Sequence, residues 1–403
     1  MANVSSSNGL EKRPKFRFPG FDEPYVLHRI GDIYAERSER GAADMELLSV
    51  TMNGGVMQRS EIEGKDNSSE DKSNYKVVRK GDMVYNSMRM WQGANGVSPY
   101  DGIVSPAYTV LTAKLPICNE YFAALFKNYK LINEFKKNSQ GMTSDTWNLK
   151  YPQIKTIKVY LPRVTEQEKV ASLIVTLDKR IAAQATLVEQ LKKYKRGVMS
   201  VLLSSKDNPY YSSETWEEVS LCDVASGFEY GMNAAATIYD GSHKYIRITD
   251  IDDSSHLYIQ DELVSPEGQV EEKYRVREND ILFARTGASV GKSYCYQRSD
   301  GNLYFAGFLI RIHINSDVDC SYVFQNTLTE AYRRWVMLES ARSGQPGINA
   351  EQYKQYRFLL PPIETQKKIS FLASNLDTLI SKGESLLSQL EQTKAALLQQ
   401  IFI

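Results

Sequence analysis

The chain has 403 residues, of which 42% are hydrophobic and 24% charged, so it is long enough for two or more globular domains. Its 49 basic and 49 acidic residues cancel, which excludes a general electrostatic pull toward nucleic acid or membrane and requires any basic surface to be local. The four cysteines stand far apart without a Cys-x-x-Cys pair, and no apolar run approaches the length of a membrane span. This cysteine usage argues against a zinc site or a disulfide framework and fits a reducing cytoplasm.

The first third of the chain predicts a globular module over residues 13–160. Residues 1–12 are polar and rich in Ser and Asn, so we expect them to be disordered. Within the module, β-branched and aromatic residues between turn signals predict strands near 25–33, 47–51, 83–86 and 156–161. A helix is expected over residues 120–136.

Residues 161–205 predict one long helix. Pro162 stands just before its start, where the missing N–H costs nothing, and Thr165 can cap the first turn. Apolar residues then recur at spacings of three and four, close to a heptad seam, over Val170, Leu173, Leu177, Ile181, Val188, Leu191, Val198 and Leu202.

The second half of the chain repeats this plan after a polar linker near residues 204–213. A second module is expected over residues 206–359, with strands near 216–224, 244–249, 277–283 and 357–360 and a helix near 322–338. A second long helix follows over residues 360–403. One offset of 199 residues (366 − 167) relates Gln167 to Gln366, Asp178 to Asp377, Leu191 to Leu390, and Lys195 to Lys394. A shared offset indicates an internal duplication of about half the chain.

The predicted fold class is therefore α/β, in the α+β sense, with two globular domains that are each followed by a long helix. Two duplicated helices of this length are best explained by packing on each other as a coiled coil. The pairing would be antiparallel if a pseudo-two-fold axis relates the halves. The alternative is that each helix packs only on its own domain.

The sequence shows no catalytic constellation. The stretch from Gly287 to Ser293 resembles a phosphate-binding loop but has three residues between its glycines where four are required. Asn208-Pro209-Tyr210-Tyr211 resembles a methyltransferase motif but lacks its second proline and lies in the linker. The four histidines show no metal-ligand spacing.

Loops rich in Arg, Asn, Gln and aromatic residues are better candidates for function, because these side chains pair with base edges or pack on bases. They lie at 85–93 and 140–148 in the first module and at 283–292 and 343–349 in the second. The alternative is that all four are ordinary surface loops. The candidate DNA-contacting residues are Asn86, Ser87, Arg89, Trp91, Gln92, Thr143, Ser144, Trp147, Arg247, Arg285, Thr286, Ser289, Lys292, Gln345 and Asn349.

The whole chain resembles the specificity subunit of type I restriction–modification systems. The resemblance rests on the two Leu-Pro helices with their Gln, on the stretch from Lys80 to Ala94, on the residues 102–108, and on the Ser-Gly-Gln-Pro-Gly-Ile-Asn loop at 343–349. It implies that each module is a target-recognition domain that reads one half of a bipartite, asymmetric double-stranded DNA site.

The same resemblance implies partners that carry the chemistry. Two methyltransferase subunits would dock on the helices, bring S-adenosylmethionine and methylate adenine N6, and two restriction subunits would add ATP- and Mg-dependent translocation and cleavage. This chain would hold no cofactor and catalyse nothing. The expected partner-binding residues on the helices are Leu173, Leu177, Leu191, Leu372, Leu376, Leu390 and Leu397. Two alternatives remain: an adaptor whose modules bind proteins, and an enzyme that uses one of the two incomplete motifs.

Overall fold

The computed structural model describes residues 13–41, 44–52, 54–64, 68–204, 208, 215–341 and 346–403. The predicted disorder of residues 1–12 and most of the linker lie outside these residues. The chain divides into two compact units, Met1–Ala185 with Ser385–Ile403, and Thr186–Glu384. Each unit therefore contains one module and a part of each long helix, whereas the sequence suggested that modules and helices are consecutive domains.

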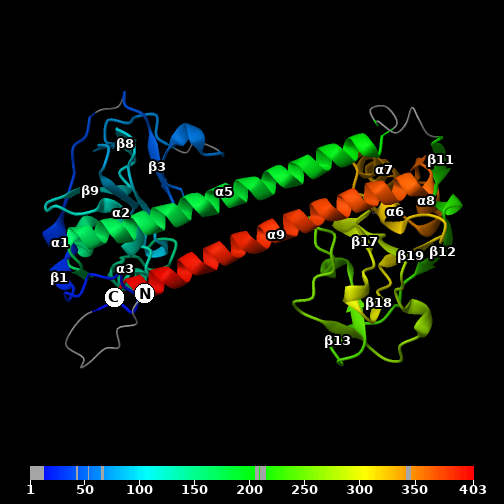
Figure 1. Cartoon of the computed structure of the whole chain (residues 1–403). Helices are drawn as coiled ribbons and strands as arrows, with labels where there is room; N and C mark the ends of the chain where they lie inside the picture. The colour runs from blue at the N-terminus through cyan, green and yellow to red at the C-terminus, as the bar shows by residue number, and fades with distance from the viewer. Residues whose placement is uncertain are drawn as a thin grey trace. The chain divides into compact units, whose positions relative to one another are not determined.

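Module 1 is built on a four-stranded sheet with the order β2-β9-β6-β7, accompanied by three two-stranded sheets (Figure 1). All its paired strands are antiparallel, and β1 pairs with β10 immediately before the first long helix. The strands are β1 (Val26–Arg29), β2 (Tyr34–Glu36), β3 (Leu48–Thr51), β4 (Gly55–Gln58), β5 (Lys76–Val78), β6 (Met83–Asn86), β7 (Asn95–Val97), β8 (Gly102–Val104), β9 (Tyr108–Ala113) and β10 (Lys158–Leu161).

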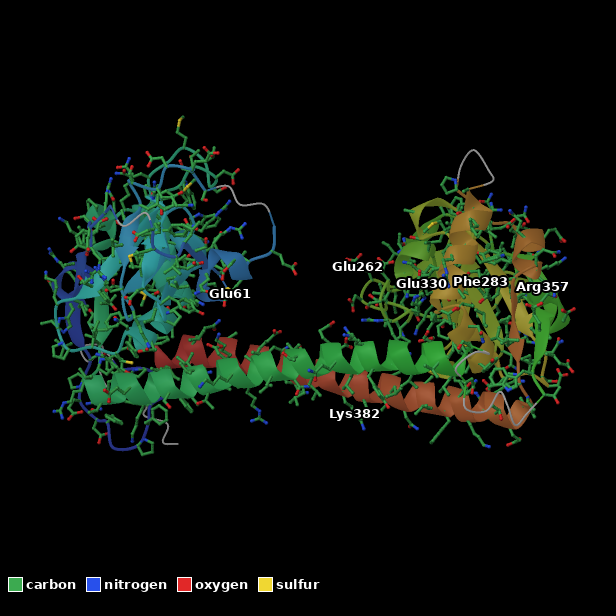
Figure 2. The ribbon with its side chains drawn as sticks, turned by 90° about the horizontal axis from the view of Figure 1, so that it is seen from above. Glu61, Glu262, Phe283, Glu330, Arg357 and Lys382 are labelled. Carbon is green, nitrogen blue, oxygen red and sulfur yellow. The ribbon has the colours of Figure 1, made fainter. Side chains whose placement is uncertain are left out.

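Module 2 repeats this frame with the sheet order β12-β19-β16-β17, and β11 pairs with β20 before the second long helix. It differs in the parallel pair β14–β18. The buried ring of Phe283 lies inside this module (Figure 2). The strands are β11 (Glu217–Ser220), β12 (Ala225–Tyr230), β13 (Ala236–Ile238), β14 (Lys244–Ile246), β15 (Val264–Pro266), β16 (Asp280–Ala284), β17 (Ser293–Cys295), β18 (Leu303–Phe305), β19 (Leu309–Ile314) and β20 (Arg357–Leu360).

The sequence predicted a single helix in each module, and this prediction is wrong because the structure has two short helices in its place. Polar residues that cap the second helix of each pair separate them. The Asn128 side chain accepts a hydrogen bond from the backbone N–H of Lys130, and Thr329 does the same for Tyr332. The short helices are α1 (Ile30–Ile33), α2 (Asn119–Leu125), α3 (Tyr129–Asn138), α4 (Tyr151–Ile154), α6 (Cys320–Asn326), α7 (Glu330–Ser340) and α8 (Ala350–Lys354).

The two long helices are confirmed as α5 (Val164–Leu202) and α9 (Ile363–Ile401), each 39 residues long and offset by the repeat distance. In the second unit, Lys195 Nζ pairs with Asp377 at 2.6 Å and Lys192 Nζ with Glu384 at 2.9 Å, so residue numbers rise on one helix as they fall on the other. The helices are therefore antiparallel there. In the first unit Lys394 pairs with Asp178, which is the repeat equivalent of the pair Lys195–Asp377.

The repeated glutamine fixes the start of each long helix to its module. Gln167 accepts a hydrogen bond from the backbone N–H of Cys118 at 3.1 Å and donates to the Pro162 carbonyl at 3.0 Å. Gln366 makes the matching bonds, from the Asp319 N–H at 2.9 Å and to the Pro361 carbonyl at 2.7 Å. Both side chains are buried, so each amide satisfies backbone groups that water cannot reach.

We expect Gln366→Ala to lower the free energy of unfolding by roughly 1–3 kcal/mol, because a buried donor and a buried acceptor lose their partner. Urea unfolding followed by circular dichroism would measure this loss. Gln389→Ala on the exposed face of the same helix is the matched control, with an expected change within about 0.5 kcal/mol. Equal stabilities of the two variants would contradict the bridging role.

The C-terminal segment of α9 belongs to the core of module 1. Ile401 and Phe402 are each 2% exposed, and the Phe402 ring meets the Tyr121 ring edge-on with centroids 5.2 Å apart. The Gln400 carbonyl accepts from the N–H of Phe16, and the Leu398 carbonyl from the Asn128 side chain. Module 1 of the same chain therefore covers the apolar side chains of Ile401 and Phe402.

The described helices include none that is long and apolar enough to cross a membrane. The long helices instead present polar side chains to solvent, such as Lys382, which projects outward from α9 (Figure 2).

Candidate nucleic-acid interface

The two candidate loops of module 1 lie against each other. The loop that follows β6 contains a short 3₁₀ turn, Met90–Gln92, and the Trp91 ring meets the Trp147 ring edge-on with centroids 5.3 Å apart. The backbone N–H of Leu149 donates to the Ser87 carbonyl at 2.8 Å. The two stretches that the sequence proposed separately therefore form one surface.

Arg89 is the exposed cation of this surface. Its backbone carbonyl accepts from Gln92 at 2.9 Å, while no ion pair of its side chain occurs among the described residues. Lys136 of α3 places its Nζ 5.7 Å from the centroid of the Trp91 ring, which adds a second positive charge. Two exposed cations beside two indole rings suit the phosphates and sugars of a nucleic acid.

Asn86 and Ser87 hold the start of this loop through local hydrogen bonds. The Asn86 side chain accepts from the backbone N–H of Met88 at 3.0 Å, and the Ser87 hydroxyl is buried with the Thr109 hydroxyl at 2.8 Å. Ser87 is 3% exposed, so the prediction of direct contact does not fit its side chain. Gln92 is half-buried beside the exposed Arg89.

The loop 140–148 is a closed, compact unit. Gln140 and Asn148 exchange backbone hydrogen bonds of 3.0 and 2.8 Å at its base, and the Thr146 hydroxyl donates to the Thr143 carbonyl at 2.9 Å. Gly141 has φ +142°, and a Cβ there would lie 2.6 Å from the Thr146 carbonyl oxygen, which requires glycine. Thr143 and Ser144 are exposed at the tip of this loop.

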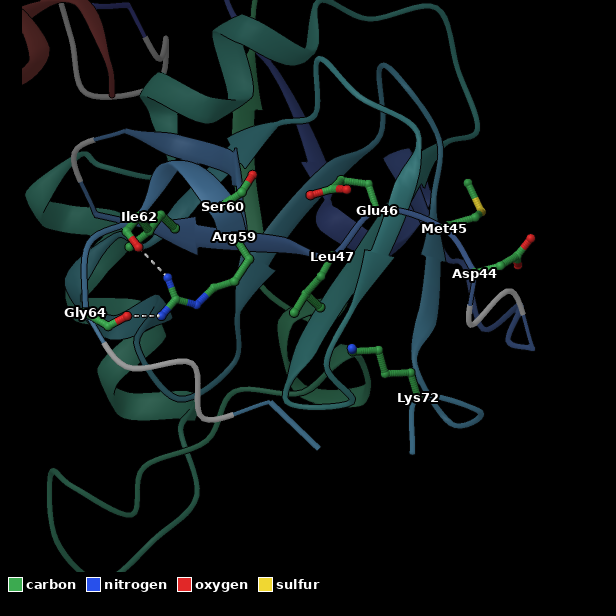
Figure 3. A pocket seen from close by; sticks show the side chains of 9 residues that line it. All are labelled: Asp44, Met45, Glu46, Leu47, Arg59, Ser60, Ile62, Gly64 and Lys72. Carbon is green, nitrogen blue, oxygen red and sulfur yellow. Dashed lines mark hydrogen bonds between the residues drawn. The ribbon is translucent and has the colours of Figure 1, made fainter. Parts of the chain in front are cut away.

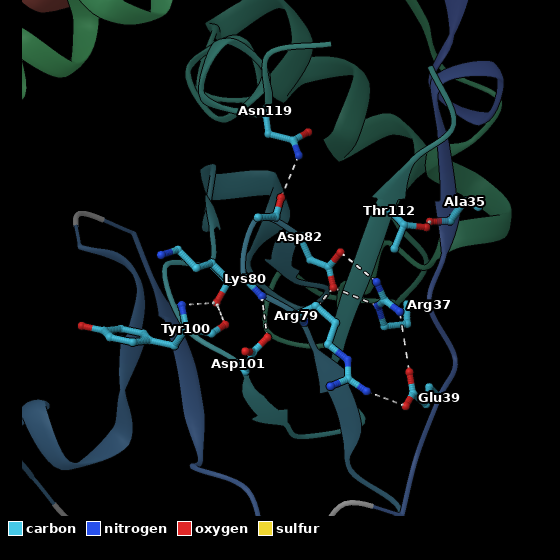
Figure 4. A network of polar contacts seen from close by, with 12 residues as sticks. Ala35, Arg37, Glu39, Arg79, Lys80, Asp82, Tyr100, Asp101, Thr112 and Asn119 are labelled. Atoms are coloured by element: carbon cyan, nitrogen blue, oxygen red, sulfur yellow. Dashed lines mark hydrogen bonds and ion pairs between the residues drawn. The ribbon is translucent and has the colours of Figure 1, made fainter. Parts of the chain in front are cut away.

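A polar network fixes the turn from which β6 starts (Figure 4). The buried Asp82 accepts two hydrogen bonds from Arg37, at 2.8 and 3.1 Å, and one from the Arg79 N–H at 2.8 Å. These bonds raise the pKa of Arg37. In module 2 the equivalent Asp280 pairs with His313 at 2.7 Å, and burial raises the pKa of its carboxyl group. The frame is thus repeated with different partners.

Module 1 also contains a polar cavity of about 540 Å³ (Figure 3). Arg59 lies in its wall and donates to the carbonyls of Ile62 and Gly64, at 2.6 and 2.9 Å. None of the candidate DNA-contacting residues lines this cavity.

Module 2 has a larger cavity of about 760 Å³, and three candidate residues line it together: Arg247, Arg285 and Thr286. Arg247 is held by Asp250 through hydrogen bonds of 2.8 and 2.7 Å, which raise the pKa of its guanidinium group. Arg285 lies over the ring of Tyr230, with its Cζ 5.0 Å from the centroid. The aromatic side chains of Tyr230 and Phe308, 43% and 61% exposed, belong to the same cavity.

Two other candidates in module 2 have structural partners. Lys292 donates to the Ile251 carbonyl at 2.9 Å and pairs with Asp253, which leaves its side chain 11% exposed. The Asn349 side chain accepts from the Gln352 N–H at 2.9 Å and caps α8 in a reciprocal capping box. We therefore assign Lys292 and Asn349 structural roles. Ser289 is half-buried, and Gln345 lies outside the described residues.

The structure also argues against the alternative that the stretch from Gly287 to Ser293 is a phosphate-binding loop. Gly287–Ser289 forms a 3₁₀ turn, and the strand β17 follows it where a phosphate-binding loop requires the N-terminus of a helix. The Lys292 amine, which would contact phosphate in such a loop, is bound to protein groups. Of the Asn208 motif, only Asn208 is described, and its side chain donates to the Leu202 carbonyl at 2.6 Å.

Three residues that sequence reasoning missed belong to these surfaces: Lys136, Tyr230 and Phe308. The exposure of Phe308 could have been predicted from the sequence, since a phenylalanine directly after Gly307 in a turn is seldom buried. Tyr230 and Lys136 stand at the end of a strand and on a helix, and only the tertiary structure brings them to Arg285 and Trp91.

The predicted partner-binding leucines lie mostly on the inner side of the long helices. Leu376 is buried, and Leu173, Leu177, Leu191, Leu390 and Leu397 are half-buried; Leu372 is 39% exposed. Other exposed apolar residues on these helices are Val175, Leu187, Tyr194, Val201, Phe371, Leu379 and Leu386.

Two modules of one β frame, each with its own exposed set of aromatic and basic side chains and each followed by a long helix, define a two-domain recognition protein. The sequence profile described as "Type I restriction modification DNA specificity domain" matches residues 36–193 and 213–392. The chain belongs to this family, and it is a non-catalytic specificity subunit of a type I restriction–modification system.

Relatives and solved structures agree with this assignment. The chain is 21% identical to the StySPI specificity subunit of Salmonella potsdam, over 71% of this chain and 65% of that subunit. It is 23% identical to the MjaVIII specificity subunit of Methanocaldococcus jannaschii, over 79% and 77% of the respective chains. In fold it is similar to the S subunit from M. genitalium, with a TM-score of 0.60 at 14% identity, over 97% of this chain and 99% of that chain. The HsdS subunit from Thermoanaerobacter tengcongensis gives a TM-score of 0.51 at 15% identity, over 97% and 98%.

Proposed function

We propose that the chain reads a bipartite, asymmetric double-stranded DNA site, with module 1 on one half and module 2 on the other. The observation that carries the proposal is the contrast between the modules. Their strand frames correspond, whereas the loop after β6 presents the Trp91–Trp147 surface and the turn after β16 presents the Arg285 cavity. Different chemistry on equivalent frames suits the reading of two different half-sites.

The proposal extends to partners that carry out methylation. Leu187 and Leu386, which the repeat relates, are 47% and 39% exposed, and Phe371 on α9 is 70% exposed. Such residues on long helices suit protein partners. We propose two adenine-N6 methyltransferase subunits with S-adenosylmethionine as their cofactor, and restriction subunits that use ATP and Mg, with no cofactor on this chain.

The test is to map methylated adenines across the genome of cells that express this chain together with its methyltransferase partner. The expected result is one two-part motif with a fixed gap, and no methylation when either protein is omitted. If the chain were an adaptor that binds only proteins, the motif would stay the same when the chain is replaced by another specificity subunit.

We expect Arg89→Ala to weaken binding at the first half-site without changing its base preference. The Arg89 side chain is exposed and has no stacked ring or ion pair among the described residues, so it suits a phosphate contact. Loss of one such contact should reduce the slope of log K against log salt by about one unit. Fluorescence anisotropy of the assembled complex on DNA at several salt concentrations would measure this slope.

Arg79→Ala is the matched control, because Arg79 is also exposed in module 1 but pairs with Glu39 at 3.0 Å. Its salt slope should equal that of the wild-type protein. Relaxed preference at a single base pair in the Arg89→Ala variant would instead identify Arg89 as a base-reading residue.

A further inference from the structure

Arg285, in the wall of the module 2 cavity, is held by two backbone hydrogen bonds and by a contact with an aromatic ring. Its backbone N–H donates to the Phe308 carbonyl at 3.1 Å, and its carbonyl accepts from the Ile348 N–H at 2.9 Å. Its guanidinium lies over the Tyr230 ring, and the Tyr230 hydroxyl in turn accepts from the Ala350 N–H at 3.2 Å. The ring is thus anchored to the start of α8, and both the backbone of Arg285 and the position of its Cζ over the ring are defined.

The side-chain donors of Arg285 make no hydrogen bond within the described part of the chain. Its Nε–H is buried without a hydrogen-bond partner, and no carboxylate there pairs with the guanidinium. Arg247, which lines the same cavity, is by contrast bound to Asp250 through two hydrogen bonds. Protein atoms cover the Nε–H, so a ligand would bind through the two Nη groups, which have no hydrogen-bond partner among the described residues and are not buried with it.

The surroundings of Arg285 favour a base edge over a phosphate. The cavity wall is largely apolar or aromatic. Met232, Ala306 and Phe308 line the cavity together with Arg285. A phosphate is strongly hydrated and is usually met by exposed, adaptable cations, as Arg89 is in module 1. A fixed planar guanidinium matches two adjacent acceptors in one plane, and guanine presents such a pair, O6 and N7, in the major groove.

We propose that Arg285 reads a guanine in the half-site of module 2, and that Tyr230 positions it by stacking beneath the guanidinium. The inference rests on the proposed DNA-reading function and names one base pair and the side chain that selects it. It also separates Arg285 from Arg89, since Arg89 has no stacked ring among the described residues.

The first experiment compares methylation motifs in cells that express the full complex with wild-type chain, Arg285→Gln or Arg285→Lys. The wild-type motif should contain a G·C pair in the half-site of module 2. Arg285→Gln should accept the other bases at that pair, with discrimination reduced roughly 10–100-fold. The half-site read by module 1 should stay unchanged, and this serves as an internal control for folding and assembly.

The second experiment tests the positioning role of Tyr230. Tyr230→Phe keeps the ring and should keep the preference for guanine, whereas Tyr230→Leu removes the ring and should weaken that preference several-fold with the overall charge unchanged. Equal preferences in the two variants would refute the positioning role.

The third experiment replaces the guanine by 7-deazaguanine in a duplex and measures binding of the purified complex. The wild-type complex should lose affinity because N7 is absent, and the Arg285→Gln complex should bind both duplexes equally. This comparison remains informative if a variant is less stable, because each complex is compared with itself on two ligands.

Two outcomes would overturn the inference, and a third would overturn its premise. A motif that keeps the same base preference in Arg285→Gln excludes base reading by this residue. Uniformly weaker binding with a salt slope reduced by about one unit assigns Arg285 to a phosphate instead. Only the absence of any motif that depends on this chain would refute the proposed function itself.

Discussion

Inserting seven residues into both long helices, after Ala185 and after Glu384, is expected to keep both half-site sequences and lengthen the gap between them. Seven residues add about 10 Å at ~1.5 Å per residue and keep the apolar seam nearly in phase. That rise corresponds to about three base pairs at ~3.4 Å each. The twist of the duplex, about ten base pairs per turn, opposes the full shift, so we expect a gain of roughly one to three base pairs.

The ion pairs explain why both helices must be lengthened. Lys195–Asp377 and Lys192–Glu384 lie on one side of the insertion points, and Asp178–Lys394 on the other. An insertion in α5 alone would displace one of these sets from its partners on α9. The repeat-equivalent insertions keep all three pairs.

Mapping of methylated adenines gives the motif of each variant. A four-residue insertion at both points is the matched control, because it adds only about 6 Å but shifts the heptad register. We expect it to reduce assembly and methylation. Full activity of the seven-residue variant at the original gap would show that the helices do not set the spacing.

Arg17→Met is expected to lower the free energy of unfolding by about 3–5 kcal/mol, the largest effect we expect from one substitution. Arg17 donates to both carboxylate oxygens of Glu166, at 2.8 and 2.7 Å, and the Glu166 side chain is 1% exposed. Without Arg17, the Tyr25 hydroxyl at 3.2 Å would be the main remaining partner of a buried charge. By the usual scaling, the Tm should fall by roughly 6–20 °C, which calorimetry would measure.

The duplication supplies the compensating variant. Thr365, which is also buried, occupies the position equivalent to Glu166 in the second repeat. Arg17→Met combined with Glu166→Thr should therefore recover most of the lost stability. Arg163→Met is the control, because its pair with Glu23 is exposed and contributes at most about 1 kcal/mol. A double variant no more stable than Arg17→Met would show that the unpaired charge is not the cause.

Periodic features of this chain could be predicted from sequence, and contacts between distant segments could not. The apolar spacing and the 199-residue offset were sufficient for α5 and α9, because a helix of this length repeats one local rule. The spacing within residues 120–136 did not reveal that one helix ends at Leu125 and that Asn128 caps the next. The meeting of Trp91 with Trp147 depends on the folded module and has no local signature.

The candidate residues divide in the same way. Residue type identified Arg89 and Arg285 as chemically suitable, but the difference in function that we propose rests on Tyr230, which lies far from Arg285 in the sequence. Asn349 could have been recognised as the cap of the helix that starts at Ala350, since Gln352 follows it at capping-box spacing. The engagement of Lys292 by Ile251 and Asp253 comes from the tertiary structure alone.

The burial of Ile401 and Phe402 in module 1 has a consequence for biosynthesis. At about 5–20 residues per second, a ribosome needs roughly ten seconds or more to add the residues between β10 and the end of α9. During that time the nascent module 1 lacks the two side chains that pack beside Tyr121, and its surface there is open to chaperones or proteases. Module 2 receives Met199 and Leu202 from α5 before its own strands are made. The amino-terminal module is thus the first to be translated and the last to be completed.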